Sequence, residues 1–243
     1  MKRHLLTLLA ALMIIPAGAA IAAGDAPKVA HQEWGFDGHL GTFDRAAQQR
    51  GLKVYREVCA ACHSLKRIAV RNLEALGYDE GQVKAIAAEY TIIDGPDEEG
   101  DMFERPGRPS DYFPSPFLND NQAKAANNNA LPPDLSLITK ARKYGHDYLY
   151  ALLTGYTSPP EDVNLLEGQH YNKAMPGHII AMAAPLSDEQ VVYEDETPQT
   201  VEQYSKDLVE FLAWAAEPEL EERKRTGIKV LIFSIVFASL MYA

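Results

Sequence analysis

Cysteine is scarce in this chain of 243 residues, which has only two, Cys59 and Cys62, both in the pentapeptide CAACH at 59–63. The sequence therefore lacks the second cysteine pair or the His-x(3–5)-His run that would complete a four-ligand structural zinc site. A disulfide framework is excluded as well, because a bridge between two such close cysteines would be strained and would restrain almost no chain. The surrounding residues look helical, which disfavours a thioredoxin-like motif in a βαβ unit.

Positive charge is also in deficit. Lysine and arginine number 23 against 34 acidic residues, which gives a formal net charge of −11 at pH 7. So acidic a surface is unsuited to a phosphate backbone, and nucleic acid is excluded as a partner. The acids concentrate in two runs, at 94–101 and 188–196, which would steer a basic protein partner by long-range attraction.

Long apolar runs are confined to the two ends of the chain. Residues 1–22 combine a basic start, an apolar stretch and a small-x-small site, and predict a secretory signal peptide. Residues 227–243 are nearly all apolar and would span roughly 25 Å as a helix, close to the hydrocarbon core of about 30 Å. We therefore expect an exported domain over 23–222 and a transmembrane anchor over 226–243. The basic residues at 223–225 oppose this orientation, but large exported domains translocate largely regardless of charge.

The pentapeptide has the spacing of a c-type haem attachment site. The thiols of Cys59 and Cys62 can each form a thioether with one haem vinyl group, and His63 can then reach the iron as the proximal ligand. Such attachment takes place outside the bacterial cytoplasm, in agreement with the predicted signal peptide. The sequence therefore predicts one covalently bound haem c in an exported domain.

Apolar periodicity predicts helices over 42–58, 136–153 and 201–216. The first of these leads directly into Cys59, and Gly51 within it permits the close approach of another helix. The middle of the chain is rich in proline, glycine and asparagine, which predicts ordered but irregular loops. The expected fold class is mainly α, with a haem core, long irregular insertions and one C-terminal transmembrane helix.

The second iron ligand is not determined by local pattern alone. Methionine opposite histidine suits electron transfer, because it raises the haem potential. Met175 and Met182 lie in a Pro/Gly-punctuated loop before the last soluble helix, and both remain open. The full set of candidates is Met102, Met175, Met182, His146, His170 and His178.

Longer motifs extend the pattern around the pentapeptide. They are RGLKVY at 50–55, DGP at 94–96, RPG at 105–107, DYFP at 111–114, AANN at 125–128, ALPPDLS at 130–136, LLTGY at 152–156, WAAEP at 214–218 and RKR at 223–225. With these motifs the chain resembles the cytochrome c1 family, in its alphaproteobacterial form, from about residue 34 to the C-terminus.

This resemblance implies roles for particular residues. Met182 becomes the axial ligand, although Ala184 stands where the family often has proline. Arg142 pairs with a haem propionate, for which a guanidinium is well shaped. The haem pocket is lined by Asn127, Pro133 and Tyr148.

The resemblance also implies a function. The chain would carry one electron from a Rieske iron–sulfur subunit to a soluble or anchored cytochrome c, beside cytochrome b in a quinol–cytochrome c reductase (bc1) complex. It would lie in the bacterial inner membrane with its haem domain on the periplasmic side. It would have no catalytic residues of its own, since the complex is the enzyme. The alternatives are a free-standing anchored cytochrome c that feeds a terminal oxidase, and a haem peroxidase, which would need an open sixth position.

Overall fold

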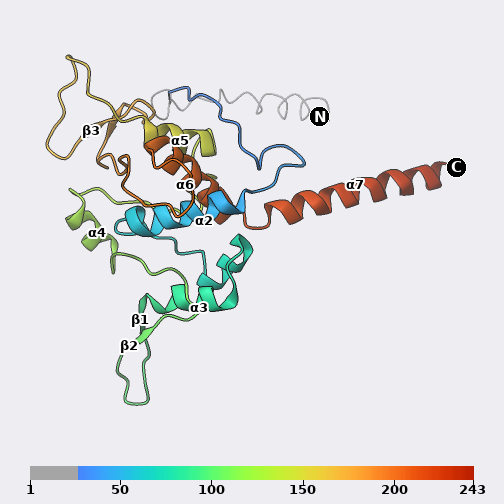
Figure 1. The fold of residues 1–243 in the computed structure, drawn as a ribbon, viewed down its shortest axis with the longest axis horizontal. Coiled ribbons are helices and arrows are strands. Elements are labelled where there is room, and N and C mark those ends of the chain that lie inside the picture. Colours follow the sequence, from blue (N-terminus) through green and yellow to red (C-terminus); the bar gives the residue numbers. More distant parts are fainter. Residues whose placement is uncertain (1–26) are drawn as a thin grey trace, which may run out of the picture.

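The computed structural model describes residues 27–243, so the predicted signal peptide lies outside the described residues. The described chain is mainly helical, as the periodicity predicts, and its strands are short (Figure 1). In chain order the elements are α2 (Arg45–Val54), a π-helical turn (Tyr55–Cys59), a 3-10 helix (Val70–Leu76), α3 (Glu80–Ala88), β1 (Thr91–Asp94), β2 (Phe103–Pro106), α4 (Asp120–Ala126), α5 (Gly145–Thr154), β3 (His170–Tyr171), β4 (Ile179–Ile180), α6 (Val201–Ala216) and α7 (Leu220–Tyr242).

The core of the domain is the contact between α2 and α6, with α5 packed on α6 (Figure 1). The close approach expected at Gly51 is confirmed, since a Cβ there would lie only 2.0 Å from the carbonyl oxygen of Asp207. Across the same contact, the guanidinium of Arg50 donates to the buried carboxylate of Asp207 at 2.9 and 3.0 Å. Because α2 continues into the π-helical turn that ends at Cys59, the packing of α2 against α6 fixes the position of the pentapeptide.

Side-chain caps explain where two of these helices begin. The Asp44 carboxylate accepts hydrogen bonds from the first backbone amides of α2, and the Thr200 hydroxyl accepts one from Gln203 at the start of α6. Such caps satisfy amides that have no partner within the helix. The prediction over 201–216 is confirmed by α6, and the one over 42–58 becomes α2 followed by the π-helical turn.

The helix predicted over 136–153 is wrong in its first half, because α5 begins only at Gly145. Residues 136–144 form turns that are held by side-chain hydrogen bonds. Asp134 accepts from the Ser136 amide at 3.0 Å, and the Ser136 hydroxyl accepts from the Arg67 amide at 3.1 Å. Such bonds compete with helical ones. Tyr144 and Gly145 then adopt left-handed φ values of 66° and 49°, which end any continuous right-handed helix.

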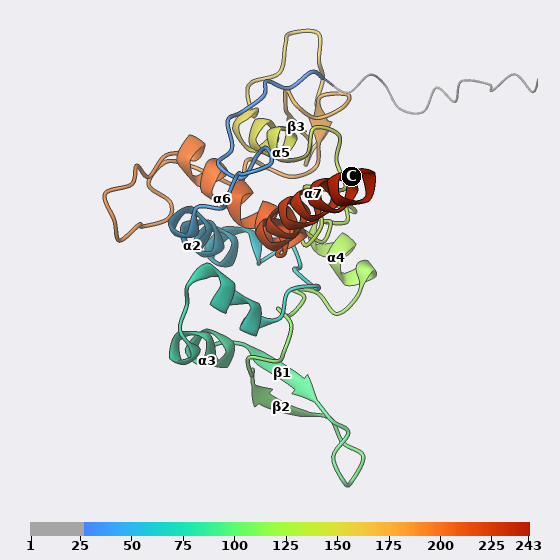
Figure 2. The ribbon, with the colours of Figure 1, turned by 90° about the vertical axis from the view of Figure 1, so that its right-hand side faces the viewer.

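The irregular middle contains a hairpin that periodicity did not predict. Strands β1 and β2 pair antiparallel, from Thr91 opposite Pro106 to Asp94 opposite Phe103. The hairpin projects from the helical body, and the acidic run 94–101 includes its tip (Figures 1 and 2). Arg105 in β2 links the turn end of β1 to the segment after the hairpin, because its guanidinium binds the carboxylates of both Asp94 and Asp111.

Helix α7 extends away from the body (Figure 1) and is long and apolar enough to cross a membrane. It begins before the anchor predicted over 226–243, because the charged residues that precede the apolar stretch are already helical. This first part is fastened to the domain. Lys224 donates to the carbonyls of Phe36 and Gly41, and Glu221 accepts from the amide of Phe43 at 2.9 Å. Hydrogen bonds, and not only the covalent chain, therefore join the first turns of α7 to the domain.

Candidate haem site

The pentapeptide forms a tight turn at the end of the π-helical segment. The amides of Cys62 and His63 both donate to the carbonyl of Cys59, at 3.1 and 2.8 Å. Cys59 is buried, Cys62 is exposed, and neither is in a disulfide. Burial raises the pKa of the Cys59 thiol to about 12, so it is protonated at neutral pH. Because neither cysteine is in a disulfide, both thiols are available for thioether bonds.

His63 is held in one tautomer by a carbonyl seventy residues away in the chain. Its Nδ1 lies 2.8 Å from the carbonyl oxygen of Pro133. A carbonyl can only accept, so Nδ1 carries the proton and donates it. Burial lowers the pKa of His63 and favours the neutral imidazole. The lone pair of Nε2 is thus left for a metal, the arrangement that orients histidine ligands in metalloproteins.

Asp134 clamps the segment after His63 to the loop that supplies the Pro133 carbonyl. Its carboxylate accepts from the Ser64 hydroxyl at 2.8 Å and from the Lys66 amide at 2.9 Å. Burial opposes its ionisation, but these hydrogen bonds outweigh burial and lower the pKa of Asp134. Asp134 lies within the ALPPDLS motif at 130–136, and no role for it was predicted from the sequence. An aspartate two positions before a serine is an Asx-turn signature that would have indicated this role.

The two candidate methionines have different hydrogen-bond partners. Met182 is half-buried, follows β4 by two residues, and accepts a hydrogen bond at its carbonyl from the Tyr156 hydroxyl at 3.0 Å. Met175 is also half-buried, but its sulfur is 3.5 Å from the Tyr148 hydroxyl and is within hydrogen-bond distance of it. Among residues 27–243, the sulfur of Met182 has no such partner.

The other candidates for the second ligand occupy different surroundings. Met102 is 61% exposed on the projecting hairpin. The ring of His146 packs against Phe36, with ring centroids 4.9 Å apart, and burial lowers its pKa. The ring of His178 stacks on Tyr171. His170 lies in β3. None of these four side chains is tied to the pentapeptide by a hydrogen bond within the described chain.

Of the remaining predicted pocket residues, Arg142, Tyr148 and Pro133 lie near another predicted site residue, and Asn127 does not. Arg142 is exposed, donates only to the backbone carbonyl of Ala141, and has no carboxylate partner in the part of the chain that the structure describes. Tyr148 is buried, which raises its pKa, and the positive charge of Arg142 opposes that rise. Asn127 instead donates to the Ala123 carbonyl at 2.7 Å and caps the end of α4. The structure thus brings Arg142 near Tyr148, and Pro133 near His63, whereas Asn127 bonds to its own helix.

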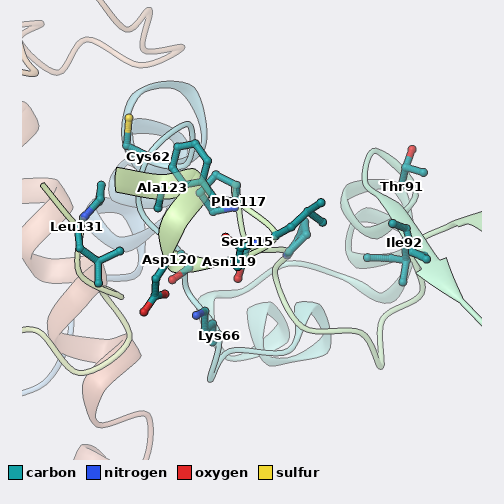
Figure 3. Close-up of a pocket in the computed structure, with 16 residues that line it drawn as sticks. Cys62, Lys66, Thr91, Ile92, Ser115, Phe117, Asn119, Asp120, Ala123 and Leu131 are labelled. Atoms are coloured by element: carbon teal, nitrogen blue, oxygen red, sulfur yellow. The ribbon is translucent and has the colours of Figure 1, made fainter. Parts of the chain in front are cut away.

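A cavity of about 490 Å³ opens beside Cys62 (Figure 3). Cys62 and Leu131 lie at one end of it and Thr91 and Ile92 of β1 at the other, with Phe117 between them. Its lining includes neither His63 nor Met182. The cavity therefore borders the attachment site and is not the space between the candidate iron ligands.

Comparison with known proteins gives consistent matches. The family model described as the cytochrome C1 family matches residues 34–243. A cytochrome c1 of Rhodospirillum rubrum is 45% identical over 253 residues, which cover 97% of this chain and 93% of that protein. A cytochrome b/c1 of Bradyrhizobium diazoefficiens is 55% identical over 232 residues, 86% of this chain but only 34% of that protein. A mitochondrial cytochrome c1 heme protein of Arabidopsis thaliana is 51% identical over 210 residues, 86% of this chain and 68% of that protein.

Proposed function

Because this chain belongs to the cytochrome c1 family, we propose that it carries single electrons through one covalently bound haem c, as a subunit of a quinol–cytochrome c reductase complex. The electron comes from the Rieske iron–sulfur subunit and leaves to a cytochrome c. The observation that carries the proposal is the state of His63, in which Pro133 holds Nδ1 and leaves Nε2 free beside two unpaired thiols. The chain itself makes and breaks no substrate bond.

The residues present fit a c-type haem. Cys59 and Cys62 would hold the porphyrin through thioethers, and His63 Nε2 and the Met182 thioether would hold the iron. Arg142, which has no carboxylate partner among residues 27–243, would balance a propionate. When bound, the haem iron supplies a one-electron couple between its ferric and ferrous states.

The protein groups around this site tune it and keep it rigid. The hydrogen bond from His63 to Pro133 makes the imidazole a stronger donor and stops the ring from rotating. The buried ring of Tyr148 would help to exclude water from the haem pocket. Met/His ligation in a dry pocket gives a high potential, which suits a carrier that accepts electrons from an iron–sulfur centre.

The partners follow from the family and the surface. Cytochrome b and the Rieske subunit would be neighbours in the membrane, where α7 would anchor the chain with residues 23–222 on the periplasmic side of the inner membrane. The acidic run at 94–101, on the projecting hairpin, would attract a basic cytochrome c towards the domain.

A redox difference spectrum of the chain, affinity-purified from its native membranes in mild detergent, tests the proposal. We expect c-type and b-type haem signals together, and haem that stays on the chain after denaturation. If only c-type haem co-purifies in several mild detergents, the chain is a free-standing anchored carrier. If no haem remains after denaturation, the attachment at Cys59 and Cys62 is refuted.

A further inference from the structure

We infer that Asn172 and Tyr156 are positioning residues for the sixth iron ligand, which hold the loop of Met182 against the end of α5. The inference rests on the proposed function, in which Met182 binds the iron. Neither side chain is itself a ligand. Each acts on the backbone of the loop between 172 and 182, one near its beginning and the other at its end.

Asn172 fixes the beginning of this loop. It is fully buried, and its Nδ2 donates to the carbonyl of Leu152 in the last turn of α5 at 2.7 Å. Its Oδ1 accepts from the amides of Ala174 and Met175 at 2.9 and 3.2 Å. One side chain thus bonds to a helix-end carbonyl, which also accepts a long bond of 3.4 Å from the Gly155 amide, and to two loop amides that would be costly to leave unpaired.

Tyr156 fixes the end of the loop. It follows α5 by two residues and forms an antiparallel bridge with Asn172, and the Lys173 amide donates to the Gly155 carbonyl at 2.9 Å alongside it. From this position its hydroxyl donates to the carbonyl of Met182 at 3.0 Å. The backbone of Met182 is therefore joined to α5 by a short rigid connection, although thirty residues of sequence separate it from Leu152.

Gly155 makes this arrangement possible. A Cβ at this position would lie 2.4 Å from the Ala151 carbonyl oxygen and 3.0 Å from Oδ1 of Asn172. Only glycine lets the chain turn out of α5 so close to the buried asparagine. The turn then directs Tyr156 towards Met182.

Such positioning matters because a thioether is a weak and neutral iron ligand. The free energy of its bond to iron has to exceed the entropy lost when the loop is ordered, and a loop that is already ordered loses less. If the Met182 backbone is released, the state with an open sixth position becomes more populated. Because Met/His ligation raises the potential, the potential then falls.

The test uses the full chain within its membrane complex and compares Tyr156→Phe and Asn172→Asp with wild type. Asn172→Asp keeps the acceptor for the loop amides but turns a buried carboxylate oxygen towards the Leu152 carbonyl, so it is the more severe of the two variants. We expect covalent haem to be retained in both variants, with a weaker methionine-to-iron charge-transfer band and a lower midpoint potential. In Tyr156→Phe we expect about a tenfold larger fraction of ferrous haem that binds carbon monoxide, as expected for one lost hydrogen bond, and in Asn172→Asp at least as large an increase. Tyr171→Phe is the matched control, because it lies in the same hairpin and its hydroxyl has no partner within residues 27–243.

The outcomes separate this inference from the proposed function. Met182→Leu should abolish the charge-transfer band, and if it does not, the ligand assignment and the inference both fail. If Met182→Leu abolishes the band but Tyr156→Phe and Asn172→Asp match the Tyr171→Phe control, only the positioning role is refuted. Loss of covalent haem or of folding in Tyr156→Phe would make the hydroxyl a requirement for assembly, which also overturns positioning.

Discussion

Replacement of Gly51 by alanine is expected to force apart the two helices on which the haem site is built. A Cβ at Gly51 would lie 2.0 Å from the Asp207 carbonyl oxygen and 2.7 Å from the Cβ of Phe211. Non-bonded carbon contacts are most favourable at about 3.5–4.0 Å. Because both blocking atoms belong to or adjoin the backbone of α6, no side-chain rotation relieves the contact, and the helices have to separate.

Two opposing contributions set the magnitude. Alanine is more favourable than glycine in a helix interior by about 1 kcal/mol. Overpacking a core costs about 1–3 kcal/mol, and the upper end applies where backbone has to move. We expect Gly51→Ala to lower the free energy of unfolding by about 2 kcal/mol, which corresponds to a Tm lower by roughly 4–8 °C for a domain of this size.

Thermal unfolding of the detergent-solubilised protein, followed by circular dichroism and haem absorbance, measures this loss. Gly227→Ala is the matched control, because Gly227 lies in α7 and a Cβ there would meet no atom within 4 Å apart from its chain neighbours and the backbone of its own helix. That variant should be as stable as wild type or slightly more so. A Gly51→Ala protein as stable as wild type would refute the close contact of α2 and α6.

Three further predictions concern charge. Burial raises the pKa of Glu210 to about 7 from 4.5, so the folded state keeps a proton that the unfolded state releases. Stability should therefore fall as pH rises from about 4.5 to 7, and Glu210→Gln should flatten that fall in thermal unfolding at stepped pH. Asp134→Ala removes the acceptor for Ser64 and Lys66 and should cost about 3 kcal/mol in denaturant unfolding at pH 7. Because the pKa of Asp134 is lowered, the part of this cost that depends on its charge should be lost as pH falls through the folded pKa; a pH-independent cost would contradict it. Reduction of a basic cytochrome c, followed by stopped flow, should slow as salt rises, and a salt-independent rate would remove the steering role of the acidic runs.

Much of the fold could be predicted wherever the determining interactions are local. The apolar stripe of 201–216 becomes α6 with the same bounds, because its period and its Thr200 cap lie within one segment. The prediction failed over 136–144, where the Ser136 amide donates to the nearby Asp134 carboxylate and the Ser136 hydroxyl accepts from the backbone amide of Arg67 in a distant segment. The hairpin of β1 and β2 was missed for a related reason. Its strands are only four residues each, and Arg105 of β2 binds Asp94, next to the turn, and Asp111, which follows the hairpin.

In the candidate site too, local features could be predicted from the sequence and long-range contacts could not. By itself the sequence determined the thiols and the imidazole of residues 59–63 and the apolar anchor, because attachment spacing and helix length are properties of continuous segments. Only the tertiary structure decided that Pro133 selects the tautomer of His63, and that Asn172 and Tyr156 join the Met182 loop to α5. The physical reason is that a hydrogen bond depends on position and direction in space. The His63 ring and the Pro133 carbonyl are seventy residues apart in the chain. They reach the right distance and direction only when the helices between them have packed.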